Sequence, residues 1–153
     1  MLSNLGEGTW ISVAKECIGY TQVDCTVDLY LDGPVFDTLS SDQYALRKFG
    51  REVDLVSQIS GVVRTMPGDK IIRSLPSFHS ISWEVKPGDF LYATVDCFTR
   101  PGVVQIIGNT DEECNIDVKK IHDLGSSGYY NEFYHFCCSS SSTFINFRTW
   151  YLY

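Results

Sequence analysis

Hydrophobic and polar residues alternate over short runs along most of the chain, which is typical of β-strands with one buried face. The alternation is clean over residues 25–31, where Cys25, Val27, Leu29 and Leu31 are separated by single residues. Residues 80–109, SISWEVKPGDFLYATVDCFTRPGVVQIIGN, predict three more strands at 80–86, 89–98 and 103–107. Pro-Gly turns punctuate this stretch at intervals of about a dozen residues, which favours an antiparallel sandwich or barrel.

The remaining strand-like runs are residues 9–20, 53–66, 70–75, 115–121, 129–138 and 143–153. One short helix is expected near 41–49, because Ser40 and Gln43 match a capping box and Gly50 suits the residue after a helix. The sequence therefore predicts an all-β fold over a single domain, 1–153. The expected architecture is an antiparallel β-sandwich of the jelly-roll or Ig-like type with about nine or ten strands, and a closed barrel is the alternative.

Composition restricts the partners. The 153 residues include 12 basic and 19 acidic side chains, a formal charge of −7, which opposes binding of nucleic acid through its phosphates. No apolar run approaches the roughly 20 residues that cross a bilayer, so no membrane insertion is expected. No signal peptide is visible, and the six cysteines are expected to be reduced thiols, with a disulfide framework as the alternative. A disulfide between Cys17 and Cys25 would need a hairpin of strands 9–20 and 23–32.

An acidic cluster is the clearest candidate metal site. It consists of Asp111, Glu112, Glu113 and Asp117, with Asp96 expected nearby on an adjacent strand. Carboxylate oxygens in loops between strands are ligands that Ca²⁺ prefers. Calcium is therefore the one candidate cofactor, and a solvated acidic loop with no cofactor is the alternative.

Aromatic residues crowd the C-terminal part of the chain. Alternation over the last strand puts aromatic side chains on both of its faces, and only one face is needed for a core. The other face could be covered within the domain, or it could meet a partner subunit or a ligand such as a sugar ring. The candidate ligand- or partner-binding residues are Tyr129, Tyr130, Tyr134, Trp150 and Tyr153.

Catalytic motifs are absent from the sequence. It contains no G-x-S-x-G, no H-E-x-x-H and no glycine-rich phosphate loop. We therefore expect no catalytic residues and a non-enzymatic interaction domain. The alternatives are a lectin-like carbohydrate-binding sandwich that uses Ca²⁺ and, third, an unrecognised hydrolase on the same kind of fold.

The strand pattern across the chain, with turns such as that in VKPGDFLYATVDC, resembles the protruding domains of tombusvirus-like and nodavirus-like capsid proteins. The resemblance implies a homodimeric spike on the virion surface that attaches to a host receptor or glycan after synthesis in the host cytoplasm. A soluble cytoplasmic protein is the alternative location. The chain lacks the basic RNA-binding arm of a shell-forming capsid protein, so an excised outer domain is implied.

Overall fold

A three-stranded antiparallel sheet lies at the centre of the computed structural model, which describes residues 9–39, 45–128 and 132–133. Its strands are β1 (Phe49–Asp54), β5 (Gly102–Gly108) and β3 (Phe78–Trp83), in the order β1-β5-β3. Val104 of β5 lies between Val53 of β1 and Ile81 of β3. A smaller sheet has the order β4-β2-β6, from β4 (Phe90–Leu91), β2 (Gly61–Thr65) and β6 (Glu132–Phe133).

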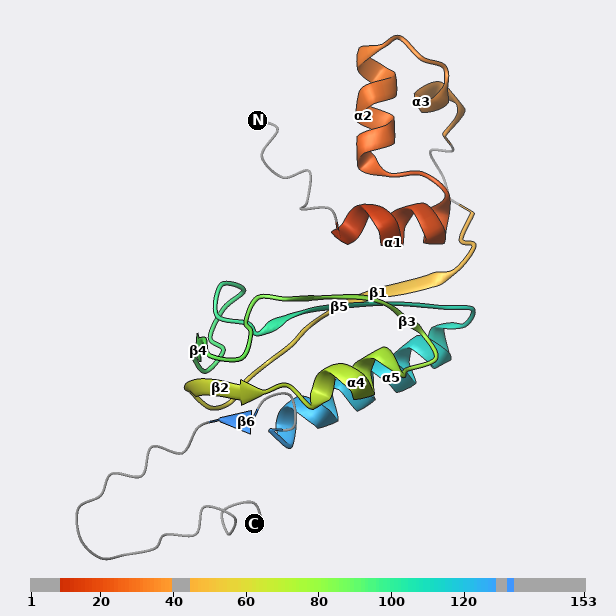
Figure 1. Ribbon diagram of the computed structural model, residues 1–153. Helices are drawn as coiled ribbons and strands as arrows, with labels where there is room; N and C mark the ends of the chain where they lie inside the picture. Colours follow the sequence, from red (N-terminus) through yellow and green to blue (C-terminus); the bar gives the residue numbers. More distant parts are fainter. Residues whose placement is uncertain (1–8, 40–44, 129–131, 134–153) are drawn as a thin grey trace, which may run out of the picture.

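Helices cover both faces of the central sheet (Figure 1). Helices α4 (Gly68–Arg73) and α5 (Asp111–Ser126) lie on one face, and α1 (Thr9–Ile18), α2 (Gln22–Tyr30) and α3 (Val35–Thr38) lie on the other side. The main core forms between the sheet and α4 and α5. Its fully buried members include Leu55, Ile72, Val104, Ile106 and Ile121.

Helix α1 approaches the sheet closely because β1 has a glycine at the contact. A Cβ added at Gly50 would collide with the side chains of Val13 and Cys17. The backbone oxygen of Cys17 also accepts a hydrogen bond from the amide of Arg47, just before β1. These contacts place α1 against the sheet face opposite the main core.

The all-β sandwich prediction is wrong, since the described chain is a mixture of helices and strands. Residues 9–20 and 25–31 are mostly helical, and Lys70 and its neighbours lie in α4. Thr21 caps α2, with its hydroxyl accepting from the amide of Asp24 and its own amide donating to the Asp24 carboxylate. This reciprocal cap stabilises a helical first turn that alternation alone does not reveal.

Residues 115–121, expected as a strand, are also helical. Buried positions in α5 are Cys114, Asp117, Ile121 and Gly125, a spacing of three or four residues that places them on one helix face. The helix begins at Thr110, whose hydroxyl accepts from the amide of Glu113. The T-x-x-E sequence at this point is itself a capping signal.

The short helix expected near 41–49 is contradicted where the structure describes it, because Phe49 and Gly50 belong to β1 and residues 45–48 are not helical. Residues 40–44 lie outside the described part. Of the three strands expected within residues 80–109, two are confirmed. β3 and β5 are both present and pair with each other, whereas most of residues 89–98 form a loop after the two-residue β4.

Candidate functional site

One face of the central sheet packs on the main core, and the other carries several polar side chains. Val53, Val104 and Ile81 point to the core under α5, so their neighbours in sequence point to the opposite face. On that opposite face, successive cross-strand rows bring together Glu52, Gln105 and Ser80, then Asp54, Val103 and Ser82. We call this set, together with Arg100 and Glu84, the polar face.

The first row is organised by Gln105, which is 1% exposed. Its Oε1 accepts from the hydroxyl of Ser80 at 2.8 Å and from that of Ser12 on α1 at 3.2 Å. Its Nε2 donates to Glu52 Oε2 at 3.4 Å. Because a buried amide with partners on both atoms has one stable orientation, the row is held in a single arrangement.

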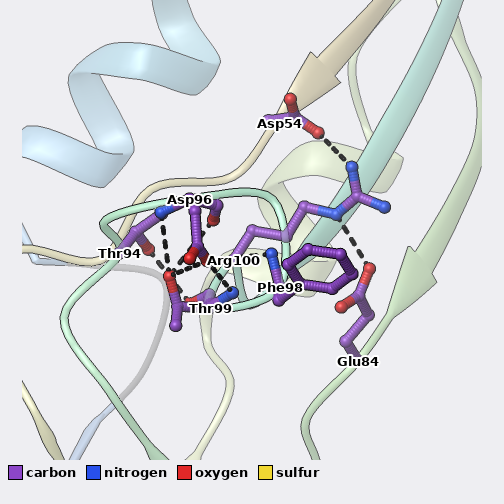
Figure 2. A network of polar contacts seen from close by, with 7 residues as sticks. All are labelled: Asp54, Glu84, Thr94, Asp96, Phe98, Thr99 and Arg100. Carbon is purple, nitrogen blue, oxygen red and sulfur yellow. Dashed lines mark hydrogen bonds and ion pairs between the residues drawn. The ribbon is translucent and has the colours of Figure 1, made fainter.

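Beside the second row, Arg100 links Asp54 at the end of β1 to Glu84, the residue that follows β3 (Figure 2). Arg100 donates from Nη1 to Asp54 Oδ1 at 2.7 Å and from Nε to Glu84 Oε1 at 2.8 Å. The bond to Glu84 and the one to Asp54 raise the pKa of the guanidinium, so Arg100 is permanently charged. Within the described residues its Nη2 makes no hydrogen bond.

The loop before Arg100 is stabilised by its own side chains, as Figure 2 shows. Asp96 Oδ1 accepts from the amides of Phe98 and Thr99, both at 3.0 Å, and from the Thr99 hydroxyl at 2.9 Å. The Thr99 oxygen in turn accepts from the amides of Val95 and Asp96. These bonds define the path by which the chain delivers Arg100 to the polar face.

The five carboxylates expected to bind calcium do not converge. Asp96 lies in the loop before Arg100, whereas Asp111, Glu112 and Glu113 occupy the first turn of α5. Asp111 forms an ion pair with Arg51, and Glu113 accepts from the amide of Asn109, so both stabilise the start of the helix. No group of three His, Cys, Asp or Glu side chains in the described ranges could hold a metal ion. The calcium site stays a prediction.

Asp117, the fifth carboxylate, is buried under β3 instead. Its Oδ2 accepts from the amide of Ser77 at 3.1 Å and from the Ser77 hydroxyl at 2.7 Å, and its Oδ1 accepts from Lys120 Nζ at 2.8 Å. Burial acts to raise the pKa of Asp117, but the hydrogen bonds from Lys120 and Ser77 outweigh it and the pKa is lowered. Asp117 is therefore an ionised structural group.

The candidate aromatic residues Tyr129, Tyr130, Tyr134, Trp150 and Tyr153 lie outside the described residues. The four cysteines that are described, Cys17, Cys25, Cys97 and Cys114, are all free thiols. No helix in the described ranges is long and apolar enough to cross a membrane.

Sequence reasoning missed the polar face. A signal was present in the acidic pair Glu52 and Asp54, which alternate with hydrophobic residues in REVDL and so share one face of a strand. Nothing local indicated that Gln105 and Arg100 would join them, because that depends on the strand order.

Comparison with known proteins supports the mixed fold. No protein-family model and no curated protein sequence matches the chain. Among solved structures, the chain is similar to an L-amino acid ligase from Bacillus licheniformis, with a TM-score of 0.62 and 13% identity, over 85% of this chain and 32% of the ligase. It is also similar to phosphoribosylglycinamide synthetase from Anaerococcus prevotii, with a TM-score of 0.53 and 11% identity, over 81% and 30% of the two chains.

The chain spans about a third of the length of each of these two neighbours. At these identities the likeness establishes the fold alone. It contradicts the capsid-like and lectin-like sandwich hypotheses, and it does not support the hydrolase alternative. The expectation of a non-enzymatic domain is contradicted as well, since both of these structural neighbours are enzymes, a ligase and a synthetase.

Proposed function

We propose that this chain is a substrate-binding unit of an ATP-dependent ligase, with the polar face of the β1-β5-β3 sheet forming one wall of the ligand site. The observation that carries the proposal is the structural match to an L-amino acid ligase over 85% of the chain. Because fold alone does not establish activity, the chemistry of the polar face has to support the assignment independently.

The charges of the polar face suit a phosphorylated ligand with its metal ion. ATP-grasp relatives use ATP and magnesium or manganese. Mg²⁺ is commonly held by one or two carboxylates together with substrate phosphates. Glu52 and Asp54 supply two carboxylates on one face of β1, and both are accessible to solvent in part. These two residues would hold the metal ion, which would neutralise phosphate charge when bound.

Arg100 complements the carboxylates. Its guanidinium plane is already held by the hydrogen bonds to Asp54 and Glu84, and within the described residues its Nη2 makes no hydrogen bond. A guanidinium whose orientation is set before binding loses little freedom when a phosphate or carboxylate oxygen arrives. The side chain is 23% exposed, so it is sheltered yet reachable. Arg100 would therefore orient an anionic group of the substrate.

The test is ligand-induced stabilisation of the recombinant chain, measured as the midpoint of thermal unfolding. A ligand that binds only the folded state stabilises it by an amount that grows with the logarithm of one plus its concentration over its dissociation constant, and the midpoint rises accordingly. We expect Mg²⁺·ATP to raise the midpoint, and the variant Glu52→Gln with Asp54→Asn to lose the magnesium-dependent part of the rise. Glu112→Gln, an exposed acid on α5, is the matched control.

A midpoint that does not respond to millimolar ATP or ADP, with or without magnesium, would refute the proposal. An equal response in the double variant would instead refute the assigned residues. Phosphate release from ATP that depends on an added amino acid would extend the result from binding to ligation.

A further inference from the structure

Glu52 differs from the other carboxylates of the polar face because no cationic side chain neutralises it. Asp54 and Glu84 both form ion pairs with Arg100. No lysine or arginine in the described ranges forms an ion pair with Glu52, and its side chain is half-buried. Charged groups that are removed from water are usually paired or coordinate a metal ion. Glu52 is therefore the carboxylate of the polar face best suited to receive a bound cation.

The donor that reaches this carboxylate is the side-chain amide of Gln105, which has one favourable orientation. Its Oε1 accepts from the hydroxyls of Ser80 and Ser12, and its Nε2 donates to Glu52 Oε2 at 3.4 Å. Turning the amide over would place Oε1 against a negatively charged carboxylate, which is unfavourable. Because the amide is neutral and the bond to Glu52 is longer than most N–H···O bonds, Gln105 orients the carboxylate without neutralising it.

Helix α1 fixes this amide in place. Val13 and Cys17 of α1 are buried in the space that a Cβ at Gly50 would occupy, so the helix lies close enough to the sheet for Ser12 to reach Gln105. Gln105 is 1% exposed, so water does not compete for its hydrogen bonds. The orientation of the amide is therefore set by packing as well as by hydrogen bonding.

We propose that Gln105 is a positioning residue that holds the Glu52 carboxylate for the metal ion of the ligand site, with Ser80 and Ser12 setting the orientation of its amide. The inference rests on the proposed function, since it concerns the same site. Gln105 acts through Glu52 and is not itself a metal ligand. Replacing a residue that hydrogen-bonds a metal ligand typically weakens metal affinity about 10–100-fold.

The experiment is isothermal titration calorimetry of the chain with ATP, in the presence and in the absence of Mg²⁺. The variant Gln105→Leu removes the amide and keeps a side chain of similar volume. We expect it to raise the dissociation constant of Mg²⁺·ATP at least about tenfold and to change that of metal-free ATP by less than about twofold.

Ser77→Ala is the matched control for loss of stability. It removes an equally buried hydrogen bond, from Ser77 to Asp117, which lies away from the polar face. A variant that only destabilises the fold should leave the dissociation constant of Mg²⁺·ATP unchanged, and circular dichroism checks that each variant is folded. If Gln105→Leu does not fold, Ser80→Ala replaces it, because that change removes one of the two hydroxyls that orient the amide; it should weaken Mg²⁺·ATP binding in the same direction.

The variant Glu52→Gln tests whether Gln105 acts through Glu52. In that background Gln105→Leu should cause no further loss of Mg²⁺·ATP affinity, because the carboxylate that it positions is gone. A further loss in the double variant would contradict the inference, as would equal weakening by Ser77→Ala or equal weakening of metal-free ATP binding. A folded Gln105→Leu or Ser80→Ala variant that binds Mg²⁺·ATP as tightly as the wild type would overturn this inference alone. A wild-type chain that does not bind Mg²⁺·ATP would overturn the proposed function together with it.

Discussion

Replacing Asp117 with alanine should be among the most damaging single changes to a buried polar group of this protein. Asp117 is 1% exposed, and its partner Ser77 is 1% exposed, so water cannot readily replace the lost carboxylate. The substitution leaves the Ser77 amide and hydroxyl without their acceptor. Each buried unsatisfied group costs about 1–3 kcal/mol. Lys120 adds little to this sum, because its side chain is half exposed.

We therefore expect Asp117→Ala to lower the free energy of unfolding by about 3 kcal/mol, against the roughly 5–15 kcal/mol of a typical domain. The assay is urea unfolding followed by circular dichroism. Asp123→Ala, an exposed acid on the same helix, is the control and should change stability by less than about 0.5 kcal/mol. The double variant Asp117→Ala with Ser77→Ala should lose less stability than the sum of the losses in the two single variants. The reason is that the double variant has no serine hydroxyl left without a partner.

The same carboxylate predicts a pH dependence. Burial raises the pKa of Asp117, but the bonds from Lys120 and Ser77 prevail and lower it below its ordinary value. The stabilisation from this group is then fully present above the ordinary carboxyl pKa of about 4 and is lost as the pH falls through the lower folded-state pKa. Asp117→Ala should show a weaker loss of stability on acidification than the wild type. A loss below about 1 kcal/mol at neutral pH, with an unchanged acid profile, would refute this reasoning.

Three further results are expected. Thr110→Ala should cost about 1 kcal/mol in urea unfolding by removing the cap of α5, whereas Thr110→Ser should be nearly neutral; equal losses would exclude the capping role. Gly102→Ala should cost about 1–3 kcal/mol, because the added Cβ would lie 2.5 Å from a backbone oxygen of β3, and an unchanged unfolding midpoint would contradict this packing. In the native protein a thiol reagent should modify the exposed Cys97 rapidly, and it should modify Cys17 and Cys114 only on unfolding, because burial raises the pKa of these two thiols. Mass spectrometry identifies the modified sites, and early labelling of either buried thiol would argue against the described core.

The sequence predicted two of the three central strands within residues 80–109 because their hydrophobic positions alternate between Pro-Gly turns. It misjudged α1, α2 and α5, although capping signals at Thr21 and Thr110 were visible in the sequence. Valine, isoleucine and threonine favour strands only weakly, so a local cap and a buried face of helical spacing override them.

The polar face could not be predicted in the same way. Arg100 meets Asp54, 46 residues away, and Glu84, 16 residues away, only because β5 lies between β1 and β3. Likewise, Gln105 becomes a buried polar centre only where α1 covers its row of the sheet. Strand order is set by the total burial of the core, and no short stretch of sequence encodes it.

By itself, then, the sequence determined the acidic character of the chain, the turns, and the strands β3 and β5, because charge, turn chemistry and alternation are local properties. The tertiary structure decided which carboxylates lie beside the Arg100 guanidinium, which stabilise the start of α5, and which one is buried next to Ser77. Those assignments arise from contacts between residues distant in sequence, and they separate a candidate ligand site from a group of similar acidic residues that stabilise the fold.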